Sequence, residues 1–460
     1  MLSILIRPIL TVLILFIPLY PKFPLQAIPG TYVAIRLDDI VISLCLFVWF
    51  LYQIKKGFPF LKEKISLLFL LYFLAISLST IHALFIFQTE PPHLLLLHLF
   101  RRFEYMSVFF ITLSAIKNRS NFTFVYLSFL LTTTLVCLYG YGQKYLNFPI
   151  ISTMNSEFAK GQLLQMADWS RISSTFAGHY DLATYLSVSL VIILAVSIRL
   201  KNKFFKFLGL ICFLLAFHNL VLTASRVSVF AFWGAVTITL LLIKKYFWVI
   251  PVSLLVLLSL FTSKELNQRL IATLYTAFPT KTPTAAPTLP APTLAPVAVP
   301  VVKTPVKKIA PLPTPLPTVT RHQIEEEIPV DADSGVARSG EIRFNAEWPR
   351  AITAYKKNPL FGTGLGSITL ATDNDYLRLL GESGLLGFIT LTSILLFFFI
   401  HTFFPKKSKN NKSQQLNFIF FGALLSFLAN AVFIDVFEAS KTAYMFWIMM
   451  ALYYQNIKHD

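Results

Sequence analysis

The chain has 460 residues, a length that in a soluble protein would predict about three domains of roughly 150 residues each. Its composition excludes that organisation. Hydrophobic residues make up 55% of the chain, charged residues only 13%, and mean hydropathy is +0.66, so polar side chains are too few to cover globular domains. The sequence therefore predicts an integral membrane protein. Aromatic residues reach 15%, which is typical of lipid-facing helices rather than of barrel strands that alternate apolar and polar residues.

Apolar runs long enough to cross a bilayer, about 20 residues each, predict twelve transmembrane helices. They lie near 2-20, 38-54, 65-87, 99-116, 122-143, 181-198, 207-224, 227-243, 246-262, 376-404, 416-434 and 442-455. We therefore expect an all-α integral membrane protein, apart from its loops. Helices one to nine occupy 1-262, a large external loop occupies 263-375, and helices ten to twelve occupy 376-460.

The net charge of +18, from 40 basic and 22 acidic residues, could reflect nucleic acid, anionic lipid or membrane topology. The location of the basic residues decides among these explanations, because lysine and arginine gather in short loops at alternate ends of the predicted helices. These loops are 55-64, 117-121, 199-206, 244-245, 405-415 and 456-460. Basic loops remain cytoplasmic, so we expect a multi-pass protein of the cytoplasmic (inner) membrane with both termini inside. Topology accounts for the charge, and no nucleic-acid partner is expected.

On this topology the external face receives the two long segments, 144-180 and 263-375. Twelve of the 26 prolines lie between Pro279 and Pro317, within a tract rich in Pro, Thr and Ala. Such a composition favours extended polyproline II and cannot build a packed core. We expect residues 279-319 to form a disordered spacer.

Charged residues gather at the predicted external ends of the helices. They are Arg36, Asp38, Asp39, Arg101, Arg102, Glu104, Arg171, Asp181, Arg226, Asp373, Asp375, Arg378, Glu382, Asp435, Glu438 and Lys441. Taken singly, each is explained by interfacial anchoring or ion pairing. Taken together, arginines and carboxylates around one membrane face suit a substrate with an anionic head and a lipid tail, because guanidinium groups match phosphate oxygens.

The sequence contains no nucleotide-binding or zinc-protease motif. Cys45, Cys137 and Cys212 lie inside apolar runs, and the eight histidines form no cluster with ligand spacing. We therefore expect no metal and no cofactor.

Three stretches combine arginines, glycines and polar residues. The first is Arg171-Ile-Ser-Ser-Thr-Phe-Ala-Gly-His179-Tyr-Asp-Leu-Ala-Thr-Tyr-Leu186, and the second is Leu-Thr-Ala-Ser-Arg226. The third runs from Arg343 through Asn358-Pro-Leu-Phe-Gly-Thr-Gly-Leu-Gly366 and Asp373-Asn-Asp-Tyr-Leu to Glu382-Ser-Gly-Leu-Leu-Gly387. This combination resembles the superfamily of O-antigen ligases and O-antigen polymerases, most specifically over 205-400.

The resemblance implies a polyprenyl-diphosphate-dependent glycan transferase. Its donor would be a glycan linked to undecaprenyl diphosphate, and its acceptor a sugar hydroxyl of a glycan or glycolipid at the external side of the bilayer. Neither a metal nor a nucleotide sugar is implied. An O-antigen or exopolysaccharide polymerase and a non-enzymatic transporter of lipid-linked glycan remain the alternatives.

The resemblance also implies roles for particular residues. Family ligases use arginines that match Arg226 and Arg343 to neutralise the diphosphate, and Arg171 is the further candidate for that contact. Gly364, Gly366 and Glu382 are expected to support the site.

The chain departs from the family pattern at the residue expected to accept a proton. Family ligases commonly carry His-Asn-x-Tyr-Leu, whereas this chain has Asp373-Asn-Asp-Tyr-Leu. Asp373 is one candidate for the proton acceptor, since burial and a neighbouring carboxylate raise a carboxyl pKa. His179 is the other. The substitution leaves the choice between ligase and polymerase open.

Overall fold

The computed structural model describes residues 2–28, 34–116, 120–151, 163–164, 170–263, 266–267, 271, 342–368, 371–405 and 411–458. The predicted spacer, 279-319, lies outside these residues. The chain divides into two units, 1–270 with 340–460 and 271–339, and the fold below is that of the first unit.

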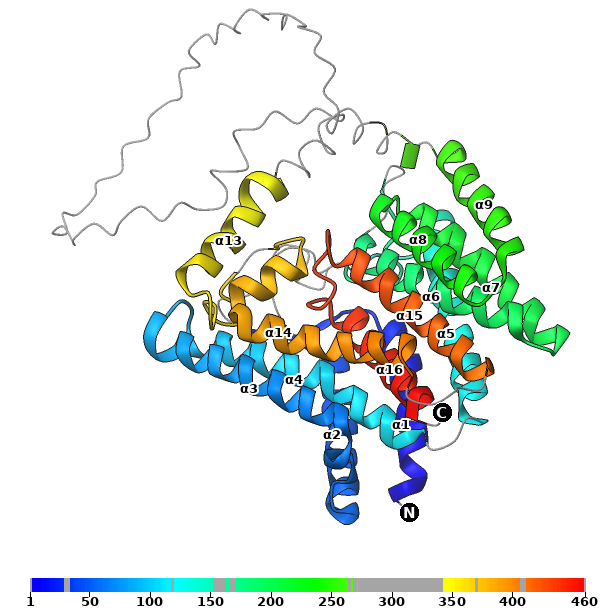
Figure 1. Ribbon diagram of the computed structural model, residues 1–460. Helices are drawn as coiled ribbons and strands as arrows, with labels where there is room; N and C mark the ends of the chain where they lie inside the picture. Colours follow the sequence, from blue (N-terminus) through cyan, green and yellow to red (C-terminus); the bar gives the residue numbers. More distant parts are fainter. Residues whose placement is uncertain are drawn as a thin grey trace, which may run out of the picture. The chain divides into compact units, whose positions relative to one another are not determined.

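Helices make up most of the described part of this unit (Figure 1). The helices of the first half of the chain are α1 (Leu2–Leu19), α2 (Leu37–Lys56), α3 (Lys64–His82), α4 (Pro92–Ala115), α5 (Ser120–Tyr145), α6 (His179–Arg199), α7 (Lys203–Leu222), α8 (Arg226–Leu242) and α9 (Val249–Thr262). Those that follow are α13 (Trp348–Lys357), α14 (Asp375–Phe403), α15 (Asn411–Asn430) and α16 (Ser440–Lys458). A helix lies at each of the twelve positions predicted from hydropathy, and α13 is added to them.

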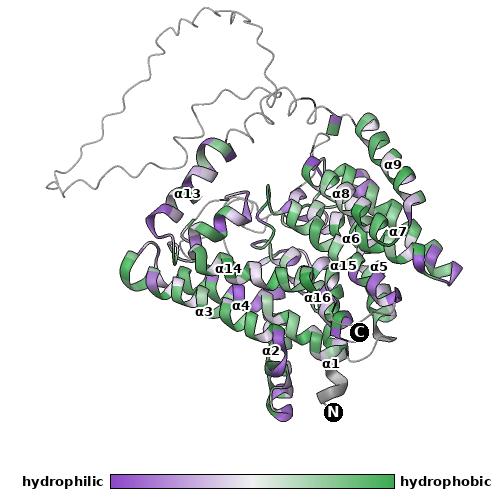
Figure 2. Cartoon of the chain, viewed as in Figure 1, coloured by the Kyte–Doolittle hydropathy of each residue, from purple (hydrophilic) through white to green (hydrophobic). Residues whose placement is uncertain are grey.

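Among the residues that the structure describes, six helical segments are long and apolar enough to cross a membrane. They are Leu37–Lys56, Lys64–Phe87, Phe122–Tyr145, His179–Arg199, Lys203–Leu222 and Asp375–Phe403. Large apolar side chains on their outer faces, such as Leu44, Leu67 and Ile389, are 59% to 61% exposed. Figure 2 shows these helices as hydrophobic over most of their length. Apolar surface of this extent is costly in water and is solvated by lipid, so the described helices are those of a membrane protein.

The helices do not pack in chain order. Helix α14 lies along α3, which also contacts α4, and α16 packs against α4 (Figure 1). Helix α15 packs against both α6 and α8. Helix α6 is enclosed by these neighbours, and 78% of the residues in its most apolar stretch are buried. Two residues of its first turn, His179 and Leu182, are buried.

Two small features were not predicted. Strands β1 (Pro24–Ala27) and β2 (Ala34–Arg36) pair antiparallel before α2. Single π-helical turns occur at η2 (Ala83–Phe87) and at η5 (Arg343–Glu347), the latter directly before α13. The end of the predicted large loop is therefore helical, and α13 packs against α14.

Helix α14 is broken at Gly384, where φ is 63° and ψ is −167°. The backbone of the preceding loop bonds to this break: Leu385 N donates to Pro359 O at 2.8 Å, and Gly364 N donates to Glu382 O at 2.9 Å. The loop 358–366 is thereby fixed against α14, one helix turn or more from the residues that begin that helix.

Candidate functional site

Arg343 and Asp373 form a close ion pair at the start of α14. Nε and Nη2 of Arg343 lie 2.8 and 2.7 Å from Oδ2 of Asp373. Arg343 is buried at the first position of η5, and Asp373 adopts a left-handed backbone conformation with φ of 48°. Burial raises the pKa of the Asp373 carboxyl; the Arg343 guanidinium opposes that shift, and Asp435 adds to it. The pair joins the end of the large loop to α14.

Tyr180 brings Arg171 and Arg343 together. It is the second residue of α6, and the guanidinium carbons of Arg171 and Arg343 lie 5.6 and 6.0 Å from its ring centroid. Both guanidinium groups also interact electrostatically with its hydroxyl group. Two arginines from distant parts of the sequence thus meet at one tyrosine, beside the carboxylate of Asp373. Sequence reasoning did not single out Tyr180, although it lies inside the first motif.

His179 occupies the first position of α6, directly beside this cluster. Its ring centroid is 4.1 Å from that of Tyr180, and the side chain is buried. The two residues predicted as proton acceptors, Asp373 and His179, are therefore linked through Arg343 and Tyr180.

Arg226 is half-buried and begins α8. Two residues on, Ser228 donates to Asn430 Oδ1 at 2.6 Å, which ties the start of α8 to the last residue of α15. The connection 431–439 follows Asn430. The same connection carries Asp435, the residue that supports Asp373.

Asp435 holds the backbone on both sides of Asp373. Its Oδ2 accepts a hydrogen bond from Thr372 N at 2.8 Å, and its Oδ1 accepts one from Asn374 N at 3.2 Å. Arg378 Nη1 donates to the same carboxylate at 2.9 Å. Because neighbouring backbone groups share one acceptor, the strained conformation of Asp373 is fixed from outside.

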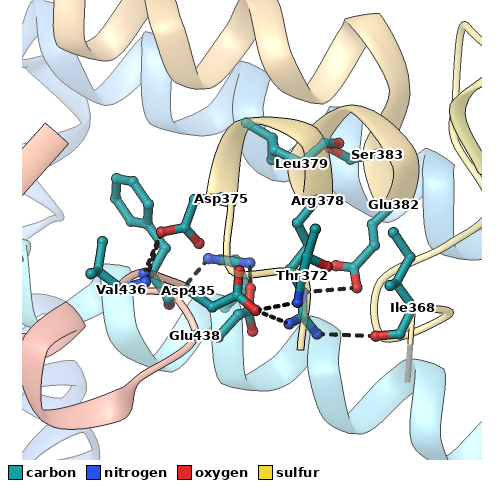
Figure 3. A network of polar contacts seen from close by, with 12 residues as sticks. Ile368, Thr372, Asp375, Arg378, Leu379, Glu382, Ser383, Asp435, Val436 and Glu438 are labelled. Carbon is teal, nitrogen blue, oxygen red and sulfur yellow. Dashed lines mark hydrogen bonds and ion pairs between the residues drawn. The ribbon is translucent and has the colours of Figure 1, made fainter. Parts of the chain in front are cut away.

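Glu382 completes this buried network (Figure 3). It is 2% exposed and lies 3.1 Å from Arg378 Nε, one turn along α14. Arg378 also donates to Ile368 O at 3.3 Å. The guanidinium group therefore meets two carboxylates and a carbonyl, as a buried charge requires. Glu382 is therefore connected to the backbone around Asp373 indirectly, through Arg378 and Asp435.

Further contacts clamp the connection 431–439. Asp375 Oδ2 accepts hydrogen bonds from Val436 N at 2.7 Å and Phe437 N at 3.2 Å. Arg102 of α4 forms an ion pair with Glu438 and donates to Phe437 O at 3.3 Å. The rim residues predicted as a group thus include several that bind one another.

Gly364 and Gly366 let the loop 358–366 pack closely against its neighbours. Both have positive φ, 103° and 80°. A Cβ atom at Gly364 would lie 2.4 Å from Ala83 Cβ, and one at Gly366 would lie 2.3 Å from the His98 ring. The space that these glycines leave is filled by η2 and α4.

Several buried polar atoms around the Arg343–Asp373 pair have no hydrogen-bond partner among the residues that the structure describes. They are Arg171 Nη1, Glu347 Oε2, Trp348 Nε1, Arg350 Nη1 and Thr372 Oγ1. Buried polar atoms are rarely left unbonded in proteins. Four of these residues lie near Arg343 or Asp373 in the sequence, and Arg171 shares Tyr180 with Arg343. This region can therefore receive a polar ligand.

Glu347 is the functional candidate that sequence reasoning missed. It follows Arg343 by one helical turn, the spacing that puts two side chains on one face. Burial raises its pKa to about 7; Asp373 and Asp435 add to the shift, and Arg343 and Arg350 oppose it. Paired arginines with ionisable carboxylates can bind an anion and take up a proton. Within the described ranges, no group of three His, Cys, Asp or Glu side chains is placed to hold a metal ion.

Residues 211–392 match a protein-family model described as O-Antigen ligase. The matched range includes Arg226, Arg343, Asp373 and the loop 358–366, whereas Arg171 and His179 precede it. No curated protein matches the chain.

Proposed function

Because residues 211–392 match the O-antigen ligase family model, we propose that this chain is a membrane glycosyltransferase of the O-antigen ligase type. It transfers a glycan from undecaprenyl diphosphate to a sugar hydroxyl at the external face of the cytoplasmic membrane. The observation that carries this proposal is the convergence of Arg171 and Arg343 on Tyr180, beside Asp373.

Two guanidinium groups that contact the same tyrosine ring suit a diphosphate leaving group. Negative charge develops on the diphosphate as its bond to the sugar breaks, and positioned cations stabilise that charge. Each charge-assisted hydrogen bond contributes about 1.5 to 3 kcal/mol. Arg171 Nη1 has no partner within the described part of the chain, so it has a donor to offer. We assign Arg226 to the same diphosphate.

The acceptor hydroxyl must lose its proton as it attacks the sugar. Asp373 and His179 are the acceptors proposed from the sequence, and their link through Arg343 and Tyr180 supports a shared site. The apolar helices around it suit a donor whose polyprenyl chain lies in the bilayer, with its diphosphate at headgroup level.

The fate of the lipid-linked glycan in cells lacking this protein tests the proposal. A ligase leaves full-length polymer on its carrier, whereas a polymerase leaves single repeat units. Purified protein in vesicles, supplied with carrier-linked glycan and acceptor, should form new glycosidic bonds. Movement of lipid across the bilayer without new bonds would instead identify a transporter.

A further inference from the structure

Glu347 is a further candidate for the proton acceptor, on the premise that the protein is the proposed transferase. We infer that Glu347 accepts the proton of the acceptor hydroxyl, and that Asp373 is a positioning residue that orients Arg343. The assignment follows from what each carboxylate already binds.

The carboxylate of Asp373 is already bound to Arg343. Two N–H groups of Arg343 meet its Oδ2, and Asp435 fixes the backbone on either side of it. A carboxylate held in this way sets the direction of the guanidinium group. Its lone pairs at Oδ2 are occupied, so a hydroxyl group would have to compete with an ion pair for them.

Glu347 is placed differently. Its side chain is half-buried, and its Oε2 is buried with no hydrogen-bond partner among the described residues. It is one helical turn from Arg343 and close enough to Asp373 to interact with it electrostatically. An acceptor hydroxyl that donates to Oε2 would satisfy this atom and stand beside the arginines that hold the diphosphate.

The charges around Glu347 suit a general base. Asp373 precedes α14, Asp435 lies in the connection 431–439, and both carboxylates favour protonation of Glu347. Arg343 of η5 and Arg350 of α13 oppose them. Burial is the largest contribution, and together these effects raise the pKa of Glu347 to about 7. A base with a pKa near the working pH combines availability with proton affinity.

The step balances without any other reactant. The hydroxyl proton passes to the Glu347 carboxylate as the hydroxyl oxygen bonds to the anomeric carbon of the donor. The bond from that carbon to the diphosphate oxygen breaks, and its electron pair leaves with undecaprenyl diphosphate. Arg171 and Arg343 neutralise the departing charge, and Glu347 releases its proton to solvent afterwards.

Single-turnover transfer in vesicles, measured from pH 5.5 to 9, tests this assignment. For the wild-type protein the rate should fall below a pH of about 7, as Glu347 becomes protonated. Glu347→Gln should lose about 100-fold or more, the scale of general-base catalysis, and its remaining rate should lack the fall at low pH. Binding of undecaprenyl diphosphate should be unchanged. Glu63→Gln, which removes a carboxylate paired with Lys458, is the matched control.

Two further variants separate the roles of the carboxylates. Formate, a small carboxylate, should restore part of the transfer by Glu347→Ala, which confirms that the variant is folded. Asp373→Asn should weaken binding of undecaprenyl diphosphate by about 10-fold while keeping the fall in rate at low pH. A Glu347→Gln variant with the wild-type rate and pH profile overturns the inference alone. Absence of transfer by the wild-type protein overturns the proposed function and this inference together.

Discussion

At the scale of single residues, the shape of the Arg343 side chain is as important as its charge. Its guanidinium group meets Asp373 through two nitrogens and also reaches Tyr180. An ammonium group cannot make both contacts, because it lacks the planar fork. We expect Arg343→Lys to lower kcat/KM for the lipid-linked donor about 10- to 100-fold, equivalent to roughly 1.4 to 2.7 kcal/mol.

Arg199→Lys is the matched control for this measurement. Arg199 ends α6, and its guanidinium group donates to Lys412 O at 3.0 Å, far along the helix from Tyr180. Its replacement should leave transfer unchanged. Wild-type kinetics for Arg343→Lys would exclude the proposed contact with the diphosphate.

The buried pair of Asp435 and Arg378 should contribute far more to stability than an exposed pair. Their side chains are only 13% and 10% exposed. Asp435→Asn keeps an oxygen for the backbone N–H groups but removes the charge, and loss of one partner of a buried pair costs about 3 to 5 kcal/mol. Thermal unfolding in detergent should reveal this loss. Lys458→Met, which breaks the exposed pair with Glu63, should change stability by less than about 1 kcal/mol.

The sequence predicted some of these residues and not others, for a physical reason. Arg171, Arg343 and Asp373 carry chemistry that is unusual beside apolar helices, so they stand out individually. The role of Asp435 depends on which backbone N–H groups donate hydrogen bonds to it, and those groups lie 61 to 63 residues away in the sequence. Tertiary packing alone brings them together. Nothing in the sequence pointed to Glu347, because its position one turn after Arg343 is known only from the helical turn η5.

At the scale of elements, the break in α14 requires glycine. Gly384 has a backbone conformation that other residues adopt only at a cost of about 1 to 3 kcal/mol. A Cβ atom there would also lie 2.4 Å from Leu360 O, a backbone atom that cannot move aside easily. We therefore expect Gly384→Ala to lower the thermal stability and to displace the loop 358–366.

Gly234 provides the comparison. It lies within α8, and a Cβ atom there would meet nothing within 4 Å. Gly234→Ala should stabilise the protein slightly, because alanine favours a helix over glycine by about 1 kcal/mol. Equal effects of the two substitutions on unfolding in detergent would show that the break at Gly384 is not a structural requirement.

Hydropathy was a good guide to the long elements and a poor one to the short ones. A lipid-facing helix needs a long apolar run, which the sequence displays directly. Strands β1 and β2 have four and three residues, too few for an alternating pattern to be recognised. Helix α13 is amphipathic, and both α13 and the turn η5 lie beyond a proline-rich tract, so the sequence predicted a loop where the chain is helical.

At the scale of the whole molecule, composition predicted the class of protein but not its internal order. Lipid tails are as apolar as leucine, so hydrophobicity does not select which helices pack together. The choice depends on shape and on buried polar contacts. One such contact joins Asn430 of α15 to Ser187 of α6 at 3.0 Å and to Ser228 of α8. These pairings are visible only in the folded chain.

The lysine-rich loops predict the orientation of the whole protein, which single cysteines can test. Lys203 begins α7 in a basic loop predicted to be cytoplasmic, and Lys357 ends α13 in the predicted external loop; both are exposed. In a background without the buried residues Cys45, Cys137 and Cys212, an impermeant thiol reagent should label Lys357→Cys in intact cells. Lys203→Cys should react only after permeabilisation, because basic loops stay in the cytoplasm. Labelling of Lys203→Cys in verified intact cells would reverse the orientation, and with it the side of the membrane on which Arg171, Arg343 and Glu347 act.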